Sequence, residues 1–309
     1  MVTTAFLFPG QGSQSVGMMA GLVGRPEIRS TFDEASHALG QDLWTLVTDG
    51  PADALNQTIN TQPAMLAAGI ATYRAYLAAG GVAPALMAGH SLGEYSALVA
   101  GKALSLTDAV KLVRFRAEAM QSAVPEGVGA MAAILGLDDE AVRAICSEAA
   151  QGEVLDAVNL NSPGQVVIAG NKAAVERGMA LAKEKGAKRA LPLPVSVPSH
   201  SRLMKPAAEK LAAYLAHVTF VSPQIPVLHN ADVLDHADPQ EIKDALARQL
   251  YSPVRWVETI VALKSRGATR FVECGPGKVL AGLNKRIDGS VATLAIIDAA
   301  SLDSARQDT

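Results

Sequence analysis

The 309-residue sequence is poor in aromatic and cysteine residues and contains no long apolar run. Aromatic residues make up 4% of the chain and apolar residues 49%, so the core must consist largely of Ala, Val, Leu and Ile on packed helices and strands. Disorder as the dominant state is therefore excluded. The length suffices for one large α/β domain with an inserted subdomain, or for two modest domains.

The two cysteines, Cys146 and Cys274, lack the spacing of metal ligands, so we expect buried, reduced thiols in a cytoplasmic protein and no metal site. No segment approaches the roughly 20 apolar residues that a membrane span requires. The first residues, MVTTAFLFPGQGSQ, lack the basic region of a signal peptide and predict a first strand.

The net charge is −3, and both signs are dispersed along the chain. Such a distribution offers no basic surface for nucleic acid and no polybasic segment for an anionic membrane. We therefore expect neither nucleic acid nor a membrane among the partners.

Short apolar runs alternate with longer amphipathic segments near both ends of the chain, which is typical of a parallel α/β sheet. We predict strands at residues 5–8, 85–88, 226–228 and 271–274. Helices are expected before Gly80, over 94–100, from Ser105 onward, across 240–266 and after Gly277. The last residues, SLDSARQDT, are expected to form a loose polar tail.

The middle of the chain has a different order, strand-helix-strand-strand-helix-strand, which is the ferredoxin-like pattern. The strands are predicted at 130–135, 155–160, 166–169 and 190–195, and the helices at 138–149 and 173–185. The turn Ser162-Pro163-Gly164 lies where the central hairpin needs it. We therefore place an inserted subdomain at 125–198, between the two parts of a discontinuous domain, 1–124 and 199–309.

The strongest local signal is Gly89-His90-Ser91-Leu92-Gly93, a G-x-S-x-G motif between a strand pattern and a helix pattern. This context predicts a nucleophile elbow, in which a serine with strained backbone is flanked by glycines that leave room for the turn. Ser91 Oγ would emerge at the C-terminal edge of the sheet, and the Leu92 N–H would face a developing oxyanion. The alternative is a chance glycine turn, which the flanking pattern disfavours.

A serine hydroxyl needs a base, so one of the six histidines should lie beside Ser91. His200, in the return from the subdomain to the main sheet, is the preferred candidate. His90 is expected to be structural or to line the pocket, because consecutive side chains diverge at a sharp turn, and the role of His229 stays open. No acidic third member is evident. The surface is expected to hold His37, His217 and His236.

Two further features favour a catalytic site. The loop Pro9-Gly10-Gln11-Gly12-Ser13-Gln14 follows the first strand and either completes an oxyanion hole or is a simple glycine turn. Arg116 lies at helical spacing from apolar residues, whereas Arg114 shares a polar face and is expected to be solvated. A buried guanidinium needs an anion, which is either a structural carboxylate or the carboxylate of a substrate. The apolar stripe consists of Ala109, Leu112, Val113 and Met120.

Seven segments in order resemble the malonyl-CoA:acyl carrier protein transacylase family, from residue 3 to about residue 297. They are FPGQGSQ, GHSLGEYSALV, the Arg116 helix, NLNSPGQVVIAG, VPSH, QLYSPVRW and ECGPGKVL. The resemblance implies an α/β-hydrolase-like large domain with a parallel sheet and an inserted ferredoxin-like subdomain. It also implies that Ser91 is the nucleophile and His200 its base, that the backbone N–H groups of Gln11 and Leu92 form the oxyanion hole, and that Arg116 binds the malonyl carboxylate.

In this family a main-chain carbonyl near the position of Gln249 orients the histidine, which agrees with the missing aspartate. Asn159 and Asn161 are similar to subdomain residues that line the family's cleft. The tetrapeptide before and including His200, VPSH, is similar to that of stand-alone bacterial members, and Leu92 is similar to malonyl-selective ones. Ser201, which directly follows His200, receives no interpretation from the sequence.

The implied activity is ping-pong transfer of a malonyl group from malonyl-CoA to the phosphopantetheine thiol of acyl carrier protein. It would supply extender units for fatty-acid or polyketide synthesis, and a malonate decarboxylase acceptor also stays open. We expect a monomer, with CoA and phosphopantetheine thioesters as substrates and no cofactor. An acidic carrier would dock on one of two basic groups. These are Lys183, Lys185, Lys188 and Arg189, and Lys278, Lys285 and Arg286.

Two other functions remain as alternatives. An α/β-hydrolase acting as an esterase or thioesterase shares the elbow but normally has an acid between serine and histidine in the chain. The inserted unit and the inward Arg116 disfavour it. A carrier-binding subunit without turnover is the second alternative.

Overall fold

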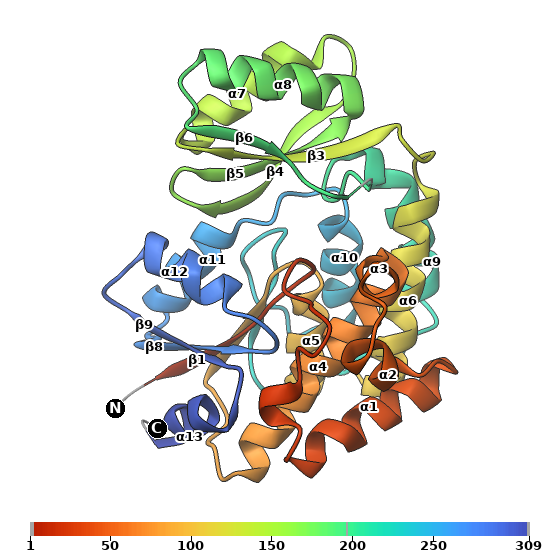
Figure 1. Cartoon of the computed structure of the whole chain (residues 1–309), viewed down its shortest axis with the longest axis vertical. Coiled ribbons are helices and arrows are strands. Elements are labelled where there is room, and N and C mark those ends of the chain that lie inside the picture. The colour runs from red at the N-terminus through yellow and green to blue at the C-terminus, as the bar shows by residue number, and fades with distance from the viewer. Residues whose placement is uncertain (1–2, 196, 308–309) are drawn as a thin grey trace.

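The computed structural model describes residues 3–195 and 197–307, which fold into two layers, each built on one β-sheet (Figure 1). The larger layer contains a parallel sheet of five strands in the order β7-β2-β1-β8-β9. The prediction of a parallel sheet is confirmed, and β9 is an additional edge strand that the sequence pattern did not indicate. The strands are β1 (Thr4–Phe8), β2 (Leu86–Gly89), β7 (Val227–Leu228), β8 (Arg270–Cys274) and β9 (Ala292–Ile296).

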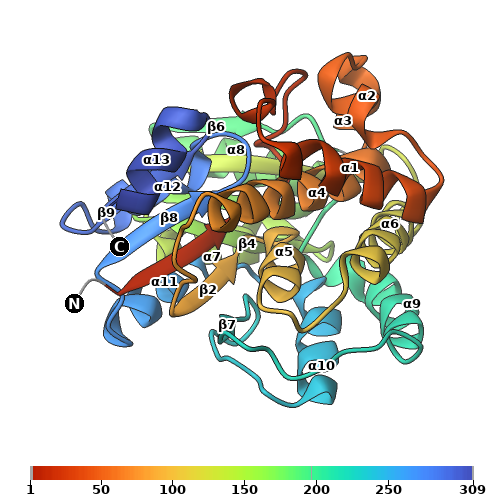
Figure 2. The same ribbon diagram turned by 90° about the horizontal axis from the view of Figure 1, so that it is seen from below.

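Both faces of the parallel sheet are buried under helices, as Figure 2 shows from below. Phe6 and Phe8 of β1 point into one hydrophobic cluster with α4, α5 and α13, while Ala5 and Leu7 point into another with α11 and α12. A strand whose two faces are both covered has apolar side chains at every position, which explains the sequence AFLF. The helices of this layer are α1 (Pro26–Leu39), α2 (Leu43–Thr48), α3 (Ala52–Asn56), α4 (Thr58–Ala78), α5 (Gly93–Ala100), α6 (Leu106–Ser122), α9 (Lys205–Leu215), α10 (Pro239–Gln249), α11 (Trp256–Ser265), α12 (Val279–Ile287) and α13 (Ala299–Gln307), with 3₁₀ turns at Ala20–Leu22 and Arg202–Met204.

The smaller layer is an antiparallel sheet in the order β4-β5-β3-β6 with α7 and α8 on its outer face (Figure 1). Its element order is the one that the sequence predicts, and the turn after Ser162 has Gly164 at φ 73°. β6 ends at Pro192, earlier than predicted. The elements are β3 (Gly129–Leu135), α7 (Asp139–Ala150), β4 (Leu155–Ser162), β5 (Gln165–Asn171), α8 (Lys172–Glu184) and β6 (Arg189–Pro192).

The predicted polar tail is wrong for its described part, because residues 299–307 form helix α13. Leu302 and Ala305, three residues apart, are fully buried against the large layer. The side chain of Asp298 accepts a hydrogen bond from the Ser301 N–H at 2.8 Å and caps the helix start. The cap lies before the segment SLDSARQDT, so that segment alone looks unstructured. Residues 308–309 lie outside the described residues.

Cys146 and Cys274 are both free and buried, as predicted. Burial raises the pKa of the Cys146 thiol to about 12 and also raises that of Cys274. Of the helices in residues 3–195 and 197–307, none combines the length and the apolar character needed to cross a bilayer.

The turn between β2 and α5 depends on two glycines that allow backbone segments to touch. A Cβ atom on Gly93 would lie 1.9 Å from the carbonyl oxygen of Phe8, and one on Gly89 would lie 1.9 Å from the carbonyl carbon of Gly93. The start of α5 therefore packs directly on the backbone of β1. This contact fixes the position of the residue in the middle of the turn, Ser91.

We expect Gly93→Ala to lower the free energy of unfolding by about 1–3 kcal/mol or more, because backbone must move to admit the methyl group. Gly282→Ala is the matched control, since its Cβ would meet nothing within 4 Å on helix α12. The control should gain about 0.5–1 kcal/mol from the lower entropy of the unfolded chain. Urea unfolding followed by circular dichroism measures both. A Gly93→Ala protein as stable as the wild type would contradict the close approach.

Candidate active site

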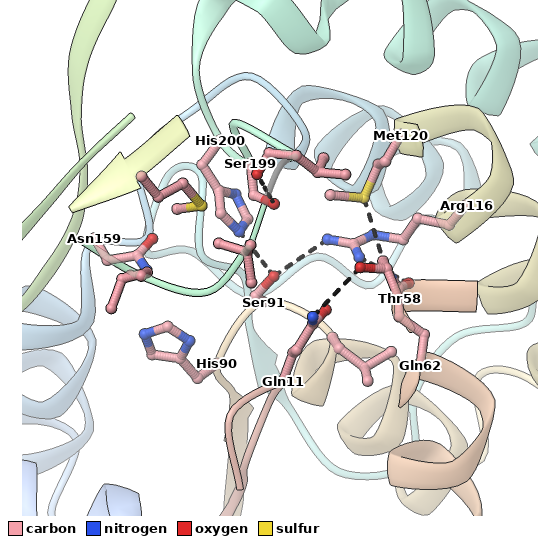
Figure 3. A pocket seen from close by; sticks show the side chains of 15 residues that line it. Gln11, Thr58, Gln62, His90, Ser91, Arg116, Met120, Asn159, Ser199 and His200 are labelled. Carbon is pink, nitrogen blue, oxygen red and sulfur yellow. Dashed lines mark hydrogen bonds between the residues drawn. The ribbon is translucent and has the colours of Figure 1, made fainter. Parts of the chain in front are cut away.

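Ser91 lies in the turn between β2 and α5 with its backbone in the left-handed region, at φ 51° (Figure 3). A non-glycine residue there costs roughly 1–2 kcal/mol, so the surroundings must hold it in place. The Ser91 N–H donates to Asn230 Oδ1 at 2.7 Å, and its carbonyl oxygen accepts from Gln249 Nε2 at 3.0 Å. Both peptide groups of the serine are thus fixed by side chains from distant segments.

His200 approaches the Ser91 hydroxyl from the loop after β6. Its Nε2 lies 2.7 Å from Ser91 Oγ, and its Nδ1 lies 2.8 Å from the carbonyl oxygen of Gln249. A carbonyl only accepts, so Nδ1 carries the proton and Nε2 is free to accept from the serine hydroxyl. Burial and the nearby Arg116 guanidinium lower the pKa of His200 to about 3. The imidazole is therefore neutral and available as a base.

A tight turn orients the histidine, whose backbone is also left-handed at φ 65°. The buried Ser201 Oγ donates to the carbonyl oxygen of Pro198 at 2.7 Å, and the Ser199 N–H donates to the carbonyl oxygen of Val197 at 2.8 Å. Ser201, which the sequence left without interpretation, therefore closes the turn that holds His200.

Arg116 is 1% exposed, and its guanidinium is held by neutral oxygens. Nη1 donates to Gln62 Oε1 at 2.9 Å, while Nη2 donates to Gln249 Oε1 at 3.0 Å and to Ser91 Oγ at 3.2 Å. Burial lowers the pKa of this guanidinium, whereas the nearby Tyr95 and Glu94 side chains raise it. The predicted burial on an apolar helix face is confirmed, and the charge points at the serine hydroxyl.

Arg114 contradicts the prediction that it is solvated. Its Nη2 donates to Asn60 Oδ1 at 3.3 Å and also contacts Gln41 Oε1, and burial lowers the pKa of its guanidinium. The segment after α1 and the start of α4 cover this face of α6, a tertiary contact that helical spacing does not reveal.

Ser91, His200 and Arg116 converge on a cavity of about 120 Å³ between the two layers (Figure 3). Gln11 is exposed at its edge and Leu92 is buried in its wall. The two residues whose N–H groups are predicted to form the oxyanion hole thus line the same cavity as the serine. The other apolar side chains of the wall are Met120, Met131, Leu193, Val195 and Val197.

The two predicted asparagines have different positions. Asn159 lines the cavity, and its buried Oδ1 has no hydrogen-bond partner within residues 3–195 and 197–307. Asn161 instead lies behind His90, with its Oδ1 2.8 Å from the Nε2 atom of that histidine. His90 also packs against Trp256, with ring centroids 5.4 Å apart, and lines the cavity as expected.

The remaining histidines lie away from the serine hydroxyl. His229 is fully buried, with Nδ1 2.7 Å from Glu94 Oε1. His236 was expected on the surface but is only 15% exposed, because its segment folds against α10 and brings its two ring nitrogens to Asp232 at 3.1 Å and Glu241 at 3.4 Å. His37 and His217 are exposed as predicted.

Sequence reasoning missed three residues of this site, Gln62, Glu94 and Asn230. Gln62 and Asn230 hold Arg116 and Ser91, and the Glu94 carboxylate contacts both Asn230 and Gln249. The available signal was Glu94, the one acidic residue in the segment GHSLGEYSALV. Gln62 and Asn230 carry no comparable sequence signal.

The arrangement is suited to nucleophilic acyl transfer. A neutral imidazole lies within hydrogen-bond distance of the serine hydroxyl, Gln11 and Leu92 line the same cavity, and a buried cation is available for an anionic group. In the part of the chain that the structure describes, no group of three or more His, Cys, Asp or Glu side chains is placed to hold a metal ion.

Known proteins match nearly the whole chain. Residues 5–297 match the family described as the acyl transferase domain. The malonyl CoA-acyl carrier protein transacylase of Escherichia coli (strain K12) is 55% identical over 306 residues, covering 99% of both chains. The corresponding protein of Bacillus subtilis (strain 168) is 47% identical and covers 99% of this chain and 97% of its own.

Solved structures agree. The acyl-carrier-protein S-malonyltransferase of Burkholderia pseudomallei is 59% identical, with a TM-score of 0.98 over 99% of this chain and 100% of its own. A malonyl-transacylase in complex with a type II PKS acyl-carrier protein is 52% identical, with a TM-score of 0.98 and the same coverage. Mixed α/β structure with one parallel and one antiparallel sheet is thus the architecture of these acyltransferases. The chain belongs to the acyl transferase domain family.

Proposed function

We propose that this protein transfers a malonyl group from malonyl-CoA to the phosphopantetheine thiol of acyl carrier protein, and so supplies extender units for fatty-acid or polyketide synthesis. The observation that carries the proposal is the meeting of His200 and Arg116 at one atom, Ser91 Oγ, at 2.7 and 3.2 Å. A base at this oxygen makes a nucleophile, and a buried guanidinium selects an acyl group with a free carboxylate. The names of the similar proteins support the same substrates.

The reaction runs in two halves through a malonyl-serine ester. Ser91 Oγ attacks the thioester carbonyl as its proton passes to His200 Nε2, and CoA leaves with that proton as a thiol. The carrier thiol then gives its proton to the same nitrogen and attacks the ester, and Ser91 recovers the proton. The hydrogen bond from His200 Nδ1 to the Gln249 carbonyl, 2.8 Å, stabilises the imidazolium in both halves without an aspartate.

The backbone N–H groups of Gln11 and Leu92 are proposed as the oxyanion hole, because both residues line the cavity beside Ser91. Gln249 supports Arg116 and His200 from behind. Asn159 is proposed to bind substrate with its unpartnered Oδ1, whereas Asn161 acts through His90. The site uses no metal or redox cofactor in this proposal.

The finer architecture is proposed as follows. The large domain, 1–124 and 199–309, is α/β-hydrolase-like, and the insert at 125–198 is ferredoxin-like. Support comes from the strand order β4-β5-β3-β6 and from a hydrophobic cluster that α7 and α8 share with this sheet alone. We propose a cytoplasmic monomer without nucleic-acid or membrane partners.

Both basic groups are exposed and remain candidates for carrier docking. In the first group, Lys185 is paired with Glu148 at 2.5 Å. In the second, Lys278 and Lys285 flank a groove along α12. An acidic carrier would be attracted to either surface in a salt-dependent way.

Malonyl-CoA should add one malonyl group to the wild-type protein, and Ser91→Ala should abolish the addition without unfolding the chain. His200→Ala should slow it by about 10²–10⁴-fold, the usual contribution of a general base. Intact mass spectrometry after rapid mixing measures both. Labelling that survives Ser91→Ala would refute the nucleophile, and an unmodified wild type would favour a binding subunit without turnover.

Arg116→Ala should lower kcat/KM for malonyl-CoA by about 10²-fold and narrow the preference over acetyl-CoA, because acetyl offers the guanidinium no carboxylate. Arg116→Lys should restore only part of the kcat/KM for malonyl-CoA, since an ammonium keeps the charge but cannot bind the carboxylate at two points. The comparison requires kcat/KM for both thioesters on all three proteins. A constant malonyl-to-acetyl ratio with reduced stability would make Arg116 purely structural.

We expect kcat/KM to fall with decreasing pH only below about pH 5, well under the ordinary histidine pKa of 6.5. The reason is that kcat/KM follows the protonation of groups in the free enzyme, where the pKa of His200 is depressed. The folded pKa of His200 is depressed to about 3, so the unfolded chain binds the proton first and stability falls as pH drops from 6.5 toward 3. Malonyl-N-acetylcysteamine, which has no phosphate to titrate, is the suitable substrate. A fall near pH 6.5 with intact folding would contradict the neutral, buried base.

A further inference from the structure

The carboxylate of Glu94 is fully buried directly beneath the serine turn, although the mechanism above does not use it. It lies in the first turn of α5, and its bonds go to other segments. Oε1 is 2.7 Å from His229 Nδ1, and Oε2 accepts from the Asn230 N–H at 2.8 Å and from Gln249 Nε2 at 2.9 Å. Three nitrogen atoms from two distant segments therefore converge on one carboxylate.

One arm from this carboxylate leads to the serine backbone. The main-chain N–H of Asn230 is held by Glu94, and its side chain then accepts from the Ser91 N–H at 2.7 Å and donates to the Gly89 carbonyl oxygen at 2.7 Å. Asn230 thus bonds two backbone groups on the N-terminal side of the left-handed residue. These hydrogen bonds of Asn230 hold the serine turn, and their effect does not depend on which acyl group is transferred.

The other arm leads to the arginine through the amide of Gln249. Nε2 of this amide donates to Glu94 Oε2 and to the Ser91 carbonyl oxygen, while Oε1 accepts from Arg116 Nη2. In the opposite orientation the amide would present NH₂ to the guanidinium, donor against donor, and its oxygen to two acceptors. A carboxylate and a carbonyl oxygen can only accept, so Glu94 and the Ser91 carbonyl together exclude that orientation.

We propose that Glu94 is a positioning residue for malonyl selectivity: its buried carboxylate orients the Gln249 amide so that Arg116 is held by an oxygen and points at Ser91. The proposal rests on the proposed function. Glu94 touches no reacting atom, and it acts on the substrate carboxylate only through Gln249 and Arg116. The Asn230 arm is separate and affects all acyl groups equally.

Glu94→Gln isolates the charge, because a glutamine can reproduce the hydrogen bonds. Its oxygen can accept from Asn230 and Gln249, and its NH₂ can donate to His229 Nδ1 once the imidazole proton moves to Nε2, which has no partner within the described residues. What disappears is one of the two acceptor-only groups that orient the Gln249 amide, because the Ser91 carbonyl oxygen remains. We therefore expect a folded protein with a less firmly oriented Arg116.

The test compares kcat/KM for malonyl-CoA and acetyl-CoA. Glu94→Gln should lower the malonyl value about 10-fold more than the acetyl value, in line with a weakened charge-assisted contact. Asn230→Ala is the matched control, since it keeps the main-chain N–H that bonds Glu94 and removes only the serine arm. It should lower both values by the same factor and leave the ratio unchanged.

A double-mutant cycle shows whether Glu94 acts through Gln249. Gln249→Ala should lower the ratio of kcat/KM for malonyl-CoA to that for acetyl-CoA, and adding Glu94→Gln should lower this ratio no further. The proposal is overturned if Glu94→Gln changes both substrates equally, or if its effect on the ratio multiplies with that of Gln249→Ala. Where Glu94→Gln does not fold, the same cycle with Glu94→Asp, whose carboxylate is one methylene shorter, gives the same two outcomes.

Failure of the proposed function gives a different result from failure of this inference. A wild-type protein that gains no malonyl group in the mass spectrum refutes the function itself. A wild-type protein that is acylated with a strong malonyl preference, and keeps that preference in Glu94→Gln, refutes only the role of Glu94.

Discussion

The contact between the start of α5 and the backbone of β1 is the constraint on which the site depends. Only glycine at position 93 lets the helix meet the Phe8 carbonyl oxygen, where a Cβ would lie at 1.9 Å. The chain must then pass from strand to helix within a few residues, which forces Ser91 to φ 51°. The strain is of order 1–2 kcal/mol, and it places the hydroxyl above the strand ends.

A second constraint is the buried positive charge of Arg116. Its guanidinium donates to neutral oxygens of Gln62, Gln249 and Ser91, so much of the cost of burying a cation is left uncompensated by direct pairing. Glu94 lies one amide away from it, beyond Gln249. The guanidinium is therefore held in one orientation and still needs an anion to balance its charge. Both properties suit the binding of a small carboxylate.

The two layers contribute differently to this cavity. The large layer supplies Ser91, Arg116 and Leu92, all on or beside packed helices, while Met131 and Asn159 come from strands of the antiparallel sheet. His200 lies in the loop that returns from one layer to the other. Its Nδ1 is fixed by the Gln249 carbonyl oxygen, so a main-chain group orients the base where many serine enzymes use an acid.

The sequence by itself determined the features that lie in contiguous or periodic residues. The serine turn follows from Gly89 to Gly93, and the burial of Arg116 follows from the apolar stripe on α6. The strand and helix order of the insert follows from its alternating apolar and amphipathic segments. The choice of His200 among six histidines rested on its place at the return from the subdomain to the main sheet and on the family resemblance, and no spacing rule selected it.

Only the tertiary structure decided what depends on distant segments meeting. Glu94, Asn230 and Gln249 are up to 155 residues apart in hydrogen-bonded pairs, so no local pattern indicates that they share one network. Arg114 is half-buried because the Gln41 and Asn60 side chains lie against α6, and α13 is a helix because Leu302 and Ala305 find an apolar surface. In each case burial by another part of the chain overrides local preference, because the free energy gained by removing apolar groups from water, with buried polar groups hydrogen-bonded, exceeds the propensity of a short segment.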